Sequence, residues 1–137
     1  MLAICVGMQA LMQRSEENNG VDCLGMFDGE VKFFGERLND ADGNKLKVPH
    51  MGWNQITPTI DHPIWAGIDA GARFYFVHSY YVHLEDTSLV AATADYGVQI
   101  HAALSRDNVF ATQFHPEKSS DMGLKLLANF LQWDGQS

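Results

Sequence analysis

The segment 2–12 restricts the fold more than any other, because it predicts a buried strand that turns directly into a helix. Leu2–Cys5 has the short, unbroken apolar run of a strand covered on both faces. Beyond Gly7, apolar residues recur at the spacing of one helix face, namely Met8, Leu11 and Met12. Asn18–Gly20 is expected to end this helix, since Asn and Gly readily adopt a left-handed C-cap. A strand followed at once by a helix is the unit of an α/β sheet, so we expect an α/β fold with further units N-terminal to Met1.

The remainder of the chain predicts strands and a closing helix. Hairpins are expected at Asp28–Gly29, between 24–27 and 31–34, and across 105–108, between Val98–Leu104 and Val109–Phe114. A loop or hairpin is expected over the polar residues 35–48, and the aromatic, β-branched stretch Phe74–Tyr81 indicates a strand. A helix capped by residues 119–121 is expected to follow. Its apolar residues include Leu124, Leu127, Ala128 and Leu131.

Length and charge exclude several classes of protein. The 137 residues suit one domain, residues 1–137. Nine basic residues against 17 acidic ones give a net charge of −8, which argues against a nucleic-acid partner. The longest apolar run, Met1–Val6, is far shorter than the roughly 20 residues of a membrane-spanning helix. Because there are only two cysteines and no basic leader, we expect a cytoplasmic protein.

Metal and cofactor sites are not predicted. The six histidines do not follow the spacing of a zinc site, and the two cysteines lie apart from them. No glycine-rich phosphate loop occurs in the sequence. We therefore expect neither a metal ion nor a cofactor.

Cys5 stands where the strand is expected to break into the helix. The N–H groups and dipole of a helix start favour a thiolate, so the pKa of this cysteine is expected to be lowered. The N–H of Val6 is suitably placed to donate to an oxyanion, and the small residues Ala3 and Gly7 allow strand and helix to approach closely. A buried structural cysteine would fit this segment equally well. Cys23 lacks such a turn and is interpreted as structural.

His115 ends the alternating stretch Val109–Phe114 and is followed by Pro116, which cannot donate a hydrogen bond to a sheet. Glu117 is close enough in sequence to accept a hydrogen bond from one imidazole nitrogen, which would leave the other nitrogen for a thiol. Taken alone, a surface histidine beside a helix cap is the simpler interpretation. Combined with Cys5, the pair indicates a cysteine nucleophile with a histidine base.

These two motifs in this order, Cys5–Gln9 (CVGMQ) and His115–Glu117 (HPE), resemble the class I, triad-type glutamine amidotransferases. Three further segments, Ser15–Val21, Pro49–Asn54 and Tyr75–Tyr80, look like the glutaminase subunit of imidazole glycerol phosphate synthase, and the resemblance covers residues 2–133. It implies a flavodoxin-like sheet with antiparallel additions. Residues 1–137 would be the C-terminal portion of that domain, without its N-terminal β-α units.

The resemblance also implies an activity and roles for individual residues. Glutamine would be hydrolysed to glutamate and ammonia, and the ammonia would pass to a (β/α)₈-barrel cyclase subunit that makes imidazole glycerol phosphate in histidine biosynthesis. Cys5 would be the nucleophile, His115 the base and acid, and Glu117 the orienting carboxylate. The residues implied in substrate binding are Val6, Gln9, Ser79 and Tyr80. Those implied at the partner interface are Trp53, Tyr75 and Lys118.

Two departures from the family pattern affect these expectations. The family usually has Gly where Ala3 stands, and its Pro-Gly-Val-Gly loop, which supplies a second oxyanion donor, is missing. Loss of one such donor typically lowers turnover by about 10²–10³. We therefore expect the chain alone to be poorly stable and weakly active. A truncated, non-catalytic interaction module and the glutaminase of another amidotransferase, including one of sugar biosynthesis, are the alternatives.

Overall fold

The computed structural model of the chain describes residues 1–17, 20–34, 43, 45–69 and 71–135. Its strands fall into sheets of five, four and two strands. In chain order the helices and strands are β1 (Leu2–Ile4), α1 (Val6–Ala10), β2 (Arg14–Ser15), β3 (Val21–Asp22), β4 (Gly29–Phe33), β5 (His50–Gln55), β6 (Thr57–Pro58), η2 (Pro63–Trp65), β7 (Arg73–His78), β8 (Tyr80–Leu84), η3 (Thr87–Leu89), β9 (Val90–Asp95), β10 (Gln99–Arg106), β11 (Val109–Thr112), η4 (Pro116–Lys118) and α2 (Ser120–Gln132).

The five-stranded sheet is the centre of the molecule and has the order β1-β11-β10-β9-β6. Its β1 and β11 run parallel, with Ile4 beside Thr112, and its remaining neighbours are antiparallel. The expected β10–β11 hairpin is confirmed, and Asp107 takes a left-handed φ of 51° in its turn. The strand that leads to Cys5 and the mixed α/β character are confirmed as well, but of the three residues of β1 only Ala3 is buried, since β1 is the last strand of the sheet. Because β1 and β11 are parallel, both carboxyl ends lie at one edge of the sheet.

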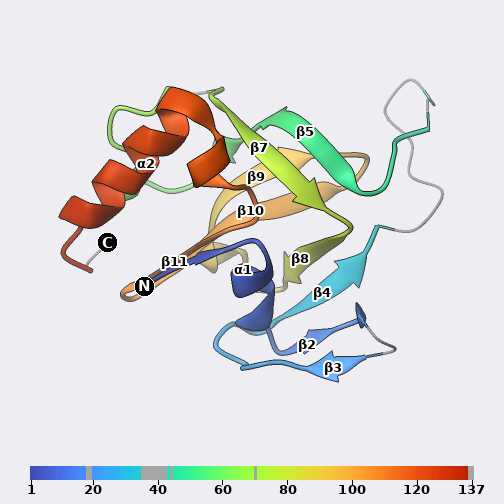
Figure 1. Cartoon of the computed structure of the whole chain (residues 1–137). Coiled ribbons are helices and arrows are strands. Elements are labelled where there is room, and N and C mark those ends of the chain that lie inside the picture. The colour runs from blue at the N-terminus through green and yellow to red at the C-terminus, as the bar shows by residue number, and fades with distance from the viewer. Residues whose placement is uncertain (18–19, 35–42, 44, 70, 136–137) are drawn as a thin grey trace.

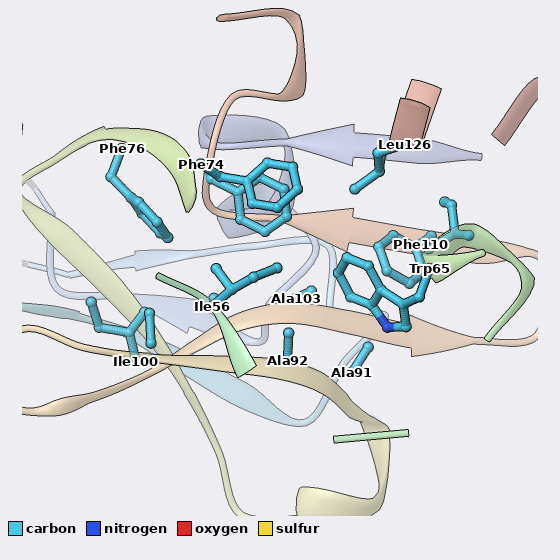
Figure 2. Close-up of a cluster of buried hydrophobic side chains, with 14 of the residues drawn as sticks. Ile56, Trp65, Phe74, Phe76, Ala91, Ala92, Ile100, Ala103, Phe110 and Leu126 are labelled. Carbon is cyan, nitrogen blue, oxygen red and sulfur yellow. The ribbon is translucent and has the colours of Figure 1, made fainter. Parts of the chain in front are cut away.

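Side chains on the two faces of the central sheet enter separate hydrophobic clusters. All four residues of β11 are buried, with Phe110 in one cluster and Val109 and Ala111 in the other. Figure 1 shows α2, β5 and β7 on one side of the central strands, and α1, β4 and β8 on the other. In Figure 2, Leu126 points from α2 toward the layer of side chains that includes Phe110 and Trp65. Burial on both faces explains the unbroken apolar runs of these strands.

The aromatic stretch 73–84 forms two strands instead of one. β7 pairs with β5, whereas β8 pairs with β4 in a different sheet, and Ser79 lies between them. The strand predicted over Phe74–Tyr81 is therefore wrong in its continuity. A change of sheet at Ser79 lets Phe74 and Phe76 enter one cluster and Val82 the other.

The expectations for residues 8–34 are partly wrong. Helix α1 ends after five residues, because Arg14 and Ser15 form β2 between β3 and β4, so the helix stops well before the expected position, and Asn18 and Asn19 lie outside the described residues. Residues 24–27 form no strand, and Gly29 begins β4 instead of closing a hairpin turn. A Cβ atom at Gly29 would lie 2.8 Å from the carbonyl oxygen of His83, so β4 and β8 approach too closely there for a larger residue. The expected loop over 35–48 lies mostly outside the described residues.

The closing helix is confirmed, and only some of its apolar residues are buried. Leu126 is fully buried, and Met122 and Phe130 pack on the same cluster. Leu124 and Leu131 are 62% and 82% exposed. The side chain of Ser119 does not cap α2, since its hydroxyl donates to the backbone oxygen of His115 and accepts from the N–H of Tyr75. Among the described residues, neither helix has the length and apolar character needed to cross a membrane.

Candidate active site

The turn between β1 and α1 holds Cys5 in a backbone conformation that side chains rarely adopt. Its φ is 53° and its ψ is −107°, and its N–H donates to the carbonyl oxygen of Thr112 at 2.7 Å. A non-glycine residue held in this region costs about 1–3 kcal/mol, so the surrounding structure must enforce it. The alanine at position 3 fits, because a Cβ atom added to Gly7 would still lie 3.7 Å from the Cβ of Ala3, an ordinary contact.

The sulfur of Cys5 is buried among hydrogen-bonding groups. It lies 3.8 Å from the carbonyl oxygen of Val77, and the amide nitrogen of Gln113 donates to it at 3.5 Å. Burial raises the pKa of the Cys5 thiol, while the N–H of Val6 and the amide of Gln113 oppose this rise. The lowered pKa predicted from the helix start is therefore wrong, since desolvation outweighs the few donors of a five-residue helix. Cys23 is a free cysteine outside this site.

His115 lies in the loop after β11, paired with a carboxylate two residues further on. Its Nδ1 atom is 2.5 Å from Oε1 of Glu117, which leaves Nε2 for another partner. The backbone N–H of His115 donates to the carbonyl oxygen of Tyr75 at 2.9 Å, and this bond fixes the loop against β7. The imidazole is partly buried, with 18% of the side chain exposed, whereas Glu117 is 43% exposed.

Cys5 and His115 meet the same edge of β7. The carbonyl of Val77 faces the sulfur and the carbonyl of Tyr75 faces the backbone of His115. Carbonyls two residues apart in a strand point to the same edge and are separated by about 7 Å. The two residues also follow the carboxyl ends of neighbouring parallel strands. No hydrogen bond joins the sulfur to the imidazole in the part of the chain that the structure describes, but both lie in one neighbourhood.

A cavity of about 380 Å³ opens beside the sulfur. The residues singled out from the sequence that line it are Cys5, Val6, Gln9, Ser79 and Tyr80. Four further lining residues, Glu17, Pro49, Val77 and His78, were given no role from the sequence, although each lies in one of the three segments that carry the resemblance. Val6 is 70% exposed, so the cavity is accessible from solvent. The structure thus brings together the segments 5–9 and 79–80, which lie some seventy residues apart in the chain.

Two buried amides connect the sulfur to Tyr80, which also lines this cavity. The Nε2 atom of Gln9 donates to the carbonyl oxygen of Tyr80 at 3.3 Å and to Oε1 of Gln113 at 3.2 Å. Gln113, which is fully buried, in turn donates to Cys5. Sequence reasoning missed Gln113. The available signal was a long amide side chain within the otherwise largely apolar stretch 109–114.

A pair of buried histidines supports the cavity wall. His50 Nδ1 lies 3.0 Å from His78 Nε2, and His78 Nδ1 lies 2.7 Å from the carbonyl oxygen of Tyr80. Burial, reinforced by the neighbouring His78, lowers the pKa of His50 to about 3. Burial also lowers the pKa of His78 to about 4. Both are therefore neutral at pH 7. In the described ranges, no three His, Cys, Asp or Glu side chains gather closely enough to hold a metal ion.

The surface implied at a partner interface lies on β5, β7 and η4, where β5 pairs with β7 and β7 contacts η4. Trp53 and Tyr75 pair across β5 and β7, with ring centroids 6.0 Å apart and nearly perpendicular planes. Trp53 is 50% exposed and Met51 is 63% exposed, so this part of β5 does not belong to the core. Lys118 lies in η4, where its N–H donates to the carbonyl oxygen of His115. The surface therefore adjoins the loop that carries the imidazole.

Comparison with known proteins gives matches over almost the whole chain. Residues 1–133 match the family model described as glutamine amidotransferase class-I. The chain is 57% identical over 135 residues to imidazole glycerol phosphate synthase subunit HisH 1 of Pseudomonas aeruginosa, covering 98% of this chain and 63% of that protein. It is 58% identical over 134 residues to subunit HisH of Acinetobacter baylyi, covering 97% of this chain and 62% of that one. The chain thus spans about 63% of the length of such relatives.

Solved structures resemble the fold at low sequence identity. A glutamine amidotransferase of Thermotoga maritima superposes with a TM-score of 0.58 at 14% identity, covering 96% of this chain and 46% of that one. The glutaminase domain of Trypanosoma brucei CTPS with bound acivicin superposes with the same TM-score at 17% identity, covering 97% of this chain and 60% of that one. The three sheets described above are therefore an arrangement known in other proteins.

Proposed function

The chain belongs to the class I glutamine amidotransferase family, and on this premise we propose that it acts as the glutaminase subunit of an imidazole glycerol phosphate synthase. In that role it hydrolyses glutamine to glutamate and ammonia for histidine biosynthesis. The observation that supports the proposal most strongly is the strained Cys5 turn, which opens into a cavity shared with Gln9 and Tyr80. A strained turn that presents a nucleophile next to a cavity is the geometry that acyl transfer requires.

In the proposed reaction the Cys5 thiolate attacks the side-chain carbonyl carbon of glutamine. The carbonyl oxygen becomes an oxyanion that accepts a hydrogen bond from the N–H of Val6. His115 donates a proton to the departing nitrogen, ammonia leaves, and a glutamyl thioester forms. His115 then takes a proton from water, which attacks the thioester and releases glutamate and the Cys5 sulfur. Glu117, bound to Nδ1, keeps Nε2 of the ring directed to these transfers.

The cavity beside Cys5 is the proposed glutamine site. Among the described residues, both hydrogen bonds of the Gln9 side chain use its amide nitrogen, which leaves the amide oxygen to accept from a ligand. Ser79 and Tyr80 also line the cavity, and their backbone groups and hydroxyls are suited to the amino-acid end of glutamine. Glu17, which also lines the cavity, supplies a negative charge suited to an ammonium group.

The surface of Trp53, Tyr75 and Lys118 is the proposed contact with a (β/α)₈-barrel cyclase subunit. Trp53 is exposed and Tyr75 is partly buried, and aromatic side chains of these two types are enriched among interface anchors. The position of this surface beside the loop of His115 would let ammonia pass to the partner without crossing bulk water. The names of the HisH relatives describe subunits of a synthase, which is consistent with such an assembly.

Acivicin, an electrophilic analogue of glutamine, tests the proposed site directly. We expect mass spectrometry of digested protein to find one adduct, on the peptide of Cys5, and excess glutamine to suppress it. Cys23 is the internal control because it lies outside the cavity, and Cys5→Ala should abolish labelling. Adducts on Cys23 alone would contradict the assignment. A chain that stays unlabelled but still co-purifies with a synthase barrel would instead favour the non-catalytic interaction module.

A further inference from the structure

We propose that Gln113 is a positioning residue of this site, holding the Cys5 sulfur and the Gln9 amide in the one arrangement that gives the sulfur an N–H donor and the cavity an acceptor oxygen. The inference rests on the proposed function, because it assigns Gln113 a role in the same site. It follows from the order of donors and acceptors along one buried chain of hydrogen bonds. That chain runs from Tyr80 through Gln9 and Gln113 to Cys5.

The backbone carbonyl of Tyr80 determines the orientation of both amides. A carbonyl oxygen can only accept, so the Gln9 atom 3.3 Å from it must be the amide nitrogen. The same nitrogen lies 3.2 Å from Gln113, which must therefore present its oxygen to Gln9. The nitrogen of Gln113 is then left to face the sulfur, at 3.5 Å. Reversing either amide would place two donors or two acceptors against each other.

The N–H from Gln113 favours the thiolate of Cys5 over the thiol. Burial acts in the opposite direction, and so does the charge of Glu117, whereas Lys118 favours the thiolate. Glu17 and His78 also line the cavity at the sulfur. Among these groups, Gln113 is the side chain that donates a hydrogen bond to the sulfur itself.

The position of Gln113 is rigid, as this role requires. Its side chain is inaccessible to solvent, and its backbone N–H donates to the carbonyl oxygen of Ala102 at 2.8 Å. Its chain neighbours Thr112 and Phe114 are likewise fully buried. A side chain fixed in this way can hold the amide of Gln9 in place, so that the Gln9 oxygen faces a ligand.

The test measures alkylation of Cys5 by iodoacetamide, which requires no glutaminase activity. In a Cys23→Ser background Cys5 is the sole thiol, and the rate at pH 8 reports its thiolate fraction. Gln113→Met keeps an unbranched side chain but removes the N–H donor. We expect the alkylation rate of Cys5 at pH 8 to fall about tenfold, and the midpoint of the curve of alkylation rate against pH to rise by about one pH unit. The matched control is Gln99→Met, at the exposed start of β10, which should leave the rate unchanged.

Kinetics with glutamine separate the two tasks of Gln113. We expect Gln113→Met to raise KM, because the Gln9 amide is no longer held, and to lower kcat in proportion to the thiolate lost. A folded Gln113→Met protein with the parent alkylation rate and midpoint would overturn the inference. If that variant does not fold, as judged by circular dichroism, Gln9→Met replaces it, and an unchanged rate there would likewise refute the coupling. Labelling of Cys23 instead of Cys5 by acivicin would contradict the proposed function, while the alkylation comparison would still decide the role of Gln113.

Discussion

The close contact between α2 and η4 predicts that one added methyl group, in the variant Gly123→Ala, lowers the free energy of unfolding substantially. A Cβ atom at Gly123 would collide with the carbonyl oxygen of Pro116 and lie 2.7 Å from the Cβ of Ser119. The first obstacle is backbone, which cannot turn aside as a flexible side chain could. The collision would push η4 away from α2, and η4 follows directly on His115.

The magnitude follows from two opposed contributions. Gly→Ala inside a helix favours folding by about 1 kcal/mol, whereas overpacking against a rigid neighbour costs about 3 kcal/mol at the upper end of its usual range. We therefore expect the free energy of unfolding of Gly123→Ala to fall by about 2 kcal/mol. For a chain of this length, the Tm should fall by roughly 5–8 °C.

Urea unfolding followed by tryptophan fluorescence measures this change, and Gly7→Ala provides the matched control. A Cβ atom at Gly7 makes only an ordinary contact of 3.7 Å with Ala3, so this variant should be as stable as the parent or up to about 1 kcal/mol more stable. If Gly123→Ala proves as stable as Gly7→Ala, the described packing of α2 against η4 is wrong.

Two further predictions concern pH and the tryptophans. In the folded chain the pKa of His50 is about 3 and that of His78 about 4, against about 6.5 for a histidine in the unfolded chain. Below about pH 6.5 the unfolded chain therefore binds more protons than the folded one, so the free energy of unfolding falls as the pH drops. The loss is at most about 1.4 kcal/mol per pH unit for each histidine. Melting curves between pH 7 and 5 should show a shallower loss for His50→Phe, and an equal slope would contradict the buried pair. Trp65→Ala should lower the free energy of unfolding by about 3 kcal/mol or more and Trp53→Ala by less than about 1 kcal/mol, because Trp65 is 8% exposed and Trp53 50%. Equal costs in urea unfolding would mean that Trp53 belongs to the core.

Local features of this chain were predictable from the sequence because near neighbours determine them. The strand that breaks into a helix at Cys5 follows from an apolar run with small residues on both sides. The β10–β11 hairpin follows from a polar turn between two apolar stretches. The approach of Glu117 to the ring of His115 follows from a separation of two residues across a proline. Residues close in sequence were enough to predict each of these features, although the strained backbone of Cys5 is itself held by its hydrogen bond to the distant Thr112.

Tertiary structure decided the questions to which local pattern offers more than one answer. Helix α2 has apolar residues on more than one face, so helical spacing alone does not say which face is buried. Packing against the central hydrophobic cluster buries Leu126 and leaves Leu131 exposed. The sequence likewise has no mark at Ser79 for a change of sheet, since strands on both sides have similar composition. In both examples, α2 and the strands on either side of Ser79, a side chain is buried where it packs against residues that are distant in the sequence.

The chemistry of the site divides in the same way. The sequence alone placed Cys5 at the turn between a strand and a helix, because that depends on the local backbone, and its role as the nucleophile is our proposal. The raised pKa of its thiol and the bond from Gln113 depend on burial by strands far along the chain. Desolvation and hydrogen-bond orientation are properties of a three-dimensional neighbourhood, which only the folded structure assembles.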